Sequence, residues 1–311
     1  MIEVHNLSKR YGEKLAVDDV SFTVQPGIVT GFLGPNGAGK STTMRMILGL
    51  DRPTSGRALI NDRSYTTSRA PLAELGALLE AKAVDKGRSA RNHLLALGAT
   101  VGIGSARVDE LLEVVGLADV ARKPAGSFSL GMGQRLGIAS ALLADPRIVM
   151  LDEPVNGLDP DGILWIRTLL RDLAAEGRTV FLSSHLMSEM ELTADHLIVI
   201  GRGRILADMS MADFIASSST RHVHVVAPDA ARLGRLLARD GVSISSRTPG
   251  HLEVEGMTAA LIGEIAASHQ IVLHELATQD PSLEEAFMEL TRDAVEYHGA
   301  APTTLTDRKA S

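Results

Sequence analysis

The chain has no cysteine among its 311 residues, and aromatic side chains make up only 3% of it. Without thiols it can form no disulfide, no thiolate metal site and no thiol nucleophile. No run approaches the roughly 20 apolar residues that a membrane-spanning helix needs. The first residues, Met1 to Val4, also lack the basic-then-apolar order of a secretion signal. These absences direct attention away from redox chemistry and lead us to expect a cytoplasmic chain.

Basic residues are also scarce, because 31 Lys and Arg stand against 38 Asp and Glu, which gives a formal net charge of −7. This balance provides no global attraction for nucleic acid, so we expect no nucleic-acid partner. Hydrophobic residues, in contrast, make up 45% of the chain. That fraction is enough for a sizeable core in one large or two modest domains.

The order of apolar runs predicts an α/β domain over residues 1–216. Several of the expected strands are apolar throughout, as in a parallel sheet that is covered on both faces. Between about residues 80 and 145, leucines at helical spacing replace strand-like runs, which predicts a helical subdomain. The expected strands are Val4 with Val17–Val24, Arg57–Ile60, Ile148–Leu151, Thr179–Leu182 and Leu197–Ile200.

A polar break at residues 217–220 precedes a region with a different pattern. Strand-like runs at 222–226, 252–254 and 271–276 alternate with helix-like spacing, which predicts a small C-terminal α+β accessory domain over residues 221–297. Its last helix is expected to open at Ser282 with a capping box completed by Glu285. Residues 298–311 are polar and aperiodic, so we expect a mobile tail.

A glycine-rich segment lies between an apolar run and a helix-like stretch, and it fits the phosphate-binding pattern G-x-x-x-x-G-K-[ST] at every fixed position: Gly34-Pro35-Asn36-Gly37-Ala38-Gly39-Lys40-Ser41. Glycines let such a loop fold around an anion, and the following helix adds its positive N-terminal end. We expect Lys40 to reach the β- and γ-phosphates and Ser41 to hold Mg²⁺. A structural glycine turn is the alternative, and the strand and helix on either side argue against it. The chain is therefore predicted to bind a nucleoside triphosphate.

Polar groups follow two of the predicted buried strands. Asp152 and Glu153 come directly after 148–151, at the carboxyl edge where parallel sheets hold ligands. We expect Asp152 to help hold Mg²⁺ and Glu153 to polarise the water that attacks the γ-phosphorus. An Asp-Glu pair that only caps a helix is the alternative. His185 follows the next strand in the same way and is placed to hydrogen-bond the γ-phosphate, although the spacing alone fits a solvated histidine equally well.

Two further residues carry weaker signals. Ser129 precedes the apolar helix-like stretch 136–143, so it is expected to cap a helix whose free amides form a second anion site. An ordinary serine cap is the alternative. Tyr11 is one of only three tyrosines and lies in a loop-like stretch, where its ring could stack on adenine.

Taken together, these motifs resemble, in order and approximate spacing, the ATPase subunits of ABC transporters. The resemblance covers residues 1 to about 216 and implies a P-loop ABC ATPase fold with a mixed sheet core. It also implies that the phosphate loop and the adjoining Thr42 bind ATP with Mg²⁺, and that two subunits close head to tail. Each ATP would then contact Ser129 and Gly131 of the other subunit, with Asp159 at the dimer seam and His185 as the γ-phosphate switch.

Two positions depart from the usual family pattern. The signature segment Phe128-Ser129-Leu130-Gly131-Met132 keeps the serine and only the second glycine, and Glu80 stands where a glutamine is common. A carboxylate at Glu80 can still bind Mg²⁺, but its extra charge leaves the metal geometry open. Both variations resemble the bacitracin- and daunorubicin-resistance branch of exporters, whose membrane channel is a separate polypeptide.

The resulting expectation is an ATPase at the cytoplasmic face of the membrane. It would drive a separately encoded permease, for export of drugs or other hydrophobic compounds, and the resemblance places residues 81–94 against that permease. The main alternative is a soluble ABC ATPase of DNA repair or translation, which usually requires a long coiled coil or two ATPase halves. A P-loop GTPase, a small-molecule kinase and an inactive binding module are further alternatives. The first two require motifs that are not visible in this sequence, and an inactive module would lack catalytic residues that are present in it.

Overall fold

The computed structural model describes residues 1–80, 84–217, 222–246, 248–279 and 282–291. They form two compact units, Met1–Met211 and Ala212–Leu290, with Thr291 assigned to the first. The division falls at the start of helix α8 (Met211–Ser217), ahead of the boundary at 216 that the sequence suggested. The expected tail, 298–311, and the end of the accessory domain lie outside the described residues.

Two sheets form the centre of the first unit. A six-stranded sheet has five parallel strands in the order β5 (Leu75–Leu78), β6 (Ile148–Asp152), β7 (Thr179–Ser184), β3 (Val29–Leu33) and β8 (His196–Gly201), and β9 (Arg204–Ser210) joins β8 antiparallel. A three-stranded antiparallel sheet has the order β2 (Lys14–Val24), β1 (Ile2–Tyr11) and β4 (Ser55–Ile60). The parallel strands are almost entirely buried, which explains their unbroken apolar sequences.

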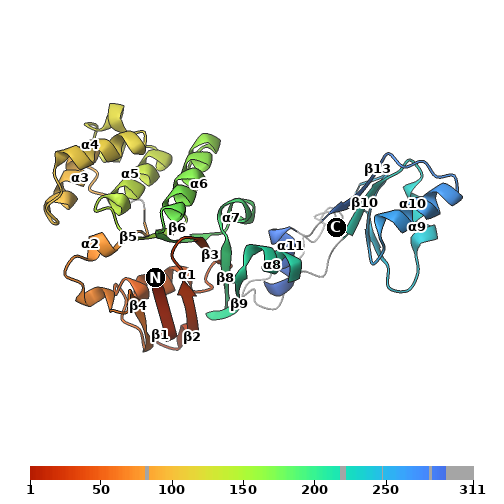
Figure 1. Ribbon diagram of the computed structural model, residues 1–311, viewed down its shortest axis with the longest axis horizontal. Helices are drawn as coiled ribbons and strands as arrows, with labels where there is room; N and C mark the ends of the chain where they lie inside the picture. The colour runs from red at the N-terminus through yellow and green to blue at the C-terminus, as the bar shows by residue number, and fades with distance from the viewer. Residues whose placement is uncertain (81–83, 218–221, 247, 280–281, 292–311) are drawn as a thin grey trace, which may run out of the picture. The chain divides into compact units, whose positions relative to one another are not determined.

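The helices of the first unit fall into two sets, and one set forms a group of its own. Figure 1 shows three helices gathered apart from the three-stranded sheet: α3 (Ala90–Ala99), α4 (Ser105–Val114) and α5 (Leu130–Leu142). They occupy the segment in which strands were not expected. The remaining helices of the unit are α1 (Lys40–Ile47), α2 (Pro71–Glu74), α6 (Pro160–Ala175) and α7 (Met187–Thr193).

Three phenylalanines join the two sheets. Phe22 on β2 lies 5.7 Å from Phe32 on β3 and 5.9 Å from Phe181 on β7, measured between ring centroids. All three belong to one buried core cluster. Burial of such rings supplies much of the hydrophobic free energy at this junction, so a chain with few aromatic residues concentrates half of its six phenylalanines here.

Between helices α8 and α11 (Leu283–Thr291), the second unit has the order of elements βαββαβ. Its antiparallel sheet is ordered β11 (Ser243–Ser245), β12 (His251–Glu255), β10 (His222–Val226) and β13 (Glu275–Gln279). Helices α9 (Ala230–Leu237) and α10 (Ala259–Ser268) contribute to the same core as the strands. The capping box at α11 is confirmed: the Ser282 amide donates to Glu285 Oε2 at 2.8 Å, and the Glu285 amide donates to Ser282 Oγ at 3.2 Å.

Local expectations were wrong at two places. Tyr11 does not lie in a loop but ends strand β1, where it pairs with Lys14 across a tight hairpin. The strand expected at 271–276 begins later, at Glu275. Ile271 is apolar because it packs into the core, and its amide donates to the Ala266 carbonyl at the end of α10. Among the described residues, no helix is both long and apolar enough to span a bilayer.

Gly76 allows α5 to pack directly on strand β5. A Cβ atom at this position would overlap the backbone carbonyl oxygen of Ala141, on α5. Backbone cannot move aside as a flexible side chain can. The absence of a side chain at Gly76 therefore sets how closely the helical subdomain approaches the sheet.

We expect Gly76→Ala to lower the free energy of unfolding by about 1–3 kcal/mol, because the added methyl overpacks this contact. Gly104→Ala is the matched control, since a Cβ there meets no atom within 4 Å and the backbone φ is −89°. Urea unfolding of both variants measures the difference. Equal stability of the two variants would contradict the packing argument.

Candidate nucleotide-binding site

The loop between β3 and α1 is closely packed against its neighbours, and glycine makes this possible. A Cβ at Gly34 would overlap the carbonyl oxygen of Ile200, on β8. Gly39 has a φ of 111°, and a Cβ there would lie 2.7 Å from the Ala16 carbonyl oxygen. Both positions exclude larger residues, so the two outer glycines of the motif determine the path of the loop.

Helix α1 begins directly after Gly39 without a side-chain cap. The amides of its first turn have no partner within the helix and form the positive end of the helix dipole. Since the loop wraps around this end, the site offers backbone donors and a favourable potential to an anion.

Lys40 is held inside the loop. Its side chain is only 7% exposed, and Nζ donates to the carbonyl oxygens of Gly34 at 2.5 Å and Pro35 at 3.3 Å. Burial lowers the pKa of the Lys40 ammonium, whereas the carboxylates of Glu153 and Asp152 act in the opposite direction. A phosphate would replace the two neutral carbonyls with a charged acceptor.

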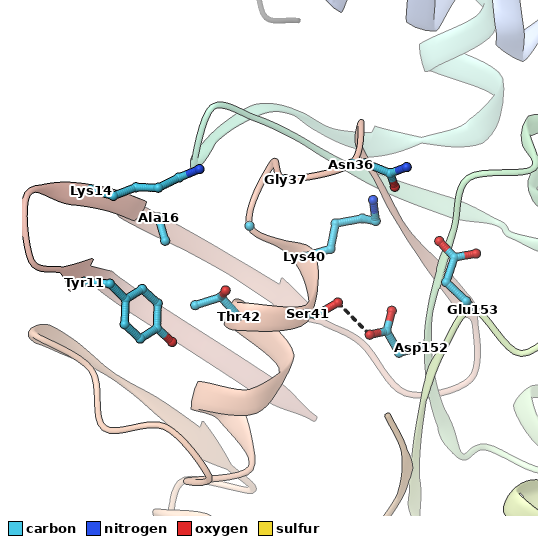
Figure 2. Close-up of a pocket in the computed structure, with 11 residues that line it drawn as sticks. Tyr11, Lys14, Ala16, Asn36, Gly37, Lys40, Ser41, Thr42, Asp152 and Glu153 are labelled. Carbon is cyan, nitrogen blue, oxygen red and sulfur yellow. Dashed lines mark hydrogen bonds between the residues drawn. The ribbon is translucent and has the colours of Figure 1, made fainter. Parts of the chain in front are cut away.

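Asp152 connects helix α1 to the adjacent strands β6 and β7. Ser41 Oγ donates to Asp152 Oδ2 at 2.7 Å (Figure 2). The hydroxyl of Ser183, at the end of β7, donates to the other carboxylate oxygen. Asp152 is therefore fixed between two hydroxyl groups at the carboxyl edge of the sheet, where its strand ends.

Glu153 follows in a conformation that is uncommon for a residue with a side chain, with φ at 52°. Its amide donates to Ser183 Oγ at 3.0 Å, and its Oε2 lies 2.7 Å from Nδ1 of His185. The structure thus brings together the residue that the sequence assigned to the attacking water, Glu153, and the one that it placed at the γ-phosphate, His185. The His185 side chain is 49% exposed.

The phosphate loop and the Asp152-Glu153 pair line one cavity of about 420 Å³. This volume lies in the range of small-molecule sites. Figure 2 shows Lys40, Asp152 and Glu153 from two separate elements facing the same space. The lining residues are Tyr11, Lys14, Ala16, Asn36, Gly37, Gly39, Lys40, Ser41, Thr42, Asp152 and Glu153.

Several residues expected at the site do not line this cavity. Ser129 caps α5 by accepting from the Met132 amide at 3.2 Å, and it borders a different cavity of about 340 Å³. Asp159 caps α6 by accepting from the Gly162 amide at 2.9 Å. Gly131 is in the first turn of α5, and Glu80 is exposed beyond the end of β5.

Tyr11 reaches the cavity from the three-stranded sheet. Its hydroxyl donates to Asp51 Oδ2 at 3.0 Å, and the Lys9 ammonium lies 4.8 Å from the ring centroid. Sequence reasoning missed Lys14 and Ala16, which line the same cavity. No motif marks them, because the β1–β2 hairpin alone brings them to the nucleotide loop.

Comparisons with known proteins identify the family of the chain. A family model described as ABC transporter matches residues 17–156. The daunorubicin resistance ATP-binding protein DrrA3 of Streptomyces coeruleorubidus is 34% identical over 303 residues, which are 94% of this chain and 96% of that protein. The chain belongs to the ATP-binding subunits of ABC transporters. It therefore binds ATP and hydrolyses it, and its first unit is the P-loop ATPase of this family.

Other relatives cover the chain to different extents. The bacitracin transport ATP-binding protein BcrA of Bacillus licheniformis is 43% identical over 212 residues, 67% of this chain and 69% of that protein. A solved ATP-binding subunit of an ABC transporter is 28% identical with a TM-score of 0.64 and covers 70% of this chain and 92% of its own. A dimeric bacterial ABC transporter cassette is 25% identical with a TM-score of 0.63, over 68% and 99%. Residues 221–284 match a domain of unknown function.

We expect Lys40→Ala to weaken ATP binding about 10- to 100-fold, because it removes a charge-assisted hydrogen bond to phosphate. Isothermal titration calorimetry measures this affinity. Lys123→Ala, which removes an equal charge from an exposed position in the helical subdomain, serves as the control. Unchanged affinity in Lys40→Ala would exclude Lys40 from phosphate binding.

The affinity is also expected to depend on pH in a defined direction. Only the ammonium form of Lys40 attracts phosphate, and burial lowers its pKa below the ordinary 10.5. ATP binding by the unmodified chain should therefore weaken as the pH rises towards this lowered pKa. In Lys40→Ala the same titration should be flatter, and parallel curves for the two proteins would contradict the assignment.

Proposed function

We propose that the chain is the ATP-driven motor of an exporter whose permease is a separate polypeptide, and that two copies enclose ATP between them. The observation that carries the proposal is the separation of two phosphate-binding helix ends. Lys40 and α1 line one cavity, whereas Ser129 at the start of α5 borders another. A second copy, arranged head to tail, would bring its Ser129 and Gly131 to the phosphates held by the first.

Glu153 is the proposed general base. Its carboxylate is hydrogen-bonded to His185, and it lines the same cavity as the phosphate loop. With ATP bound, Glu153 would orient the attacking water and His185 would hydrogen-bond the γ-phosphate. Lys40 would exchange its carbonyl partners for phosphate oxygens.

A magnesium ion fits the donor groups at Ser41 and Asp152. The hydroxyl and carboxylate oxygens are hard ligands of the kind that Mg²⁺ prefers, and they already lie 2.7 Å apart. Such an ion would neutralise charge on the phosphates during transfer. Glu80 is the third candidate ligand, but it does not line the cavity.

Closure of the dimer would depend on ATP, because the α5 helix end of one copy needs the γ-phosphate held by the other. Asp159 begins α6 and is proposed to lie at this seam. Hydrolysis removes the bridging phosphate and lets the copies separate. Each round of ATP binding and hydrolysis would therefore close and reopen the dimer.

The permease is proposed to dock on the helical subdomain, at the cytoplasmic face of the membrane. The cavity of about 340 Å³ lies between residues 84–86 and the segment 125–136, and apolar side chains contribute much of its lining. Its lining residues are Val84, Lys86, Ala125, Gly126, Phe128, Ser129, Leu130, Gly133 and Leu136. A helix of the permease that contacts this cavity from the side of Val84 and Lys86 would sense the position of α5 and leave Ser129 to the nucleotide of the other copy. The name of the daunorubicin resistance relative supports export as the direction of transport, because removal of a drug from the cell gives resistance to it.

We expect Glu153→Gln to retain ATP binding and to lower hydrolysis about 100-fold or more, the usual cost of losing a general base. Because bound ATP is then not cleaved, this variant should be dimeric in ATP and monomeric without it. Light scattering in both states and a phosphate-release assay measure these effects. Asp161→Asn, at an exposed position outside the cavity, is the control. Undiminished hydrolysis in Glu153→Gln would remove Glu153 from its role.

A mixing experiment tests the head-to-tail arrangement. Lys40→Ala damages the phosphate loop but leaves Ser129 intact, whereas Ser129→Arg removes the serine but leaves the phosphate loop intact. Each variant alone has no complete site and should hydrolyse little ATP. Mixed dimers contain one complete site, built from the phosphate loop of one copy and the Ser129 of the other. Part of the hydrolysis should return on mixing. If the site were complete within one chain, mixing would restore nothing.

A further inference from the structure

Gln134 is a buried polar residue in the second turn of α5. Its side chain is 4% exposed, and Nε2 donates to the backbone carbonyl oxygen of Glu153 at 3.0 Å. This hydrogen bond connects the helix that carries Ser129 to the residue that we propose as general base.

The backbone that Gln134 contacts is held in an unusual conformation. Glu153 has a positive φ, which costs free energy for a residue with a Cβ and persists only where surrounding contacts impose it. Its amide is fixed by Ser183, and its carbonyl also accepts from the Asn156 amide at 3.2 Å. Of these hydrogen bonds to the Glu153 backbone, only the one from Gln134 comes from the helical subdomain.

Other contacts keep α5 against the segment that follows Glu153. A Cβ at Gly131 would lie 2.7 Å from the Gly157 carbonyl oxygen, and Leu130 packs against Gly157 in turn. The guanidinium of Arg135 lies 4.6 Å from the ring centroid of Trp165, on α6. The N-terminal half of α5 and residues 153–165 thus form one packed arrangement, so a movement of the helix would displace the Glu153 carbonyl.

We propose that Gln134 is a positioning residue for ATP hydrolysis. It fixes the backbone from which the Glu153 side chain reaches the nucleotide, and it makes this position depend on α5. Because Ser129 of the same helix grips the ATP bound by the other copy, engagement of one nucleotide adjusts the base that acts on the second. This inference rests on the proposed role of Glu153 and on the head-to-tail dimer.

The test replaces the amide without changing the size of the side chain. Gln134→Met should lower kcat about 10- to 100-fold, since a misplaced catalytic group loses reactivity steeply with distance. KM and the affinity for ATP should stay unchanged, because Gln134 does not line the nucleotide cavity. Ser140→Ala is the matched control: it removes a side-chain hydrogen bond to Leu136 on the same helix, and kcat should be unaffected.

A double variant separates positioning from a general loss of structure. If Gln134 acts through Glu153, then adding Gln134→Met to Glu153→Gln should cause no further fall in the residual rate. A further fall equal to that of the single variant would overturn the proposal, as would an unchanged kcat in Gln134→Met. Gln134→Leu provides a second apolar replacement if the methionine variant does not fold. Failure of Glu153→Gln itself to reduce hydrolysis would instead overturn the proposed function.

Discussion

The carboxylate of Asp152 joins the elements on which the site depends. It accepts hydrogen bonds from Ser41 on α1 and from Ser183 on β7 while it ends β6 itself. Helix α1 and the parallel strands β6 and β7 are thereby fixed at one edge of the sheet, and Glu153 is the next residue in the chain after Asp152. A charged acceptor that is satisfied by two hydroxyl donors is stable at a partly buried position. The Mg²⁺ ion that we propose for this site would enter an arrangement that already exists.

Much of this arrangement could be predicted from the sequence, because the relevant signals are local. Buried parallel strands produce unbroken apolar runs, and the phosphate loop requires glycines at fixed positions. Asp152, Glu153 and His185 follow such runs directly, so their common location follows from the rule that parallel strands end at the same edge. The caps at Ser129 and Ser282 were equally visible, since capping depends on residues within one turn.

The parts that could not be predicted depend on contacts between distant segments. Lys14 and Ala16 line the cavity only because a hairpin folds against the phosphate loop. Strand β13 was misplaced because Ile271 is apolar for packing and not for pairing. The hydrogen bond from Gln134 to Glu153 joins residues on two elements and has no periodic signature. In each case tertiary packing decides, and a single sequence contains no direct trace of it.

Trp165 is the only tryptophan of the chain, and it lies under the guanidinium of Arg135, where α5 meets α6. Indole emission responds to a neighbouring charge and to water, so all tryptophan fluorescence of this protein originates at one junction, between α5 of the helical subdomain and α6. The molecule consequently contains an intrinsic optical probe at the junction that, in the proposed mechanism, moves when ATP is bound between two copies and when it is released. Its signal can be followed in real time without any label.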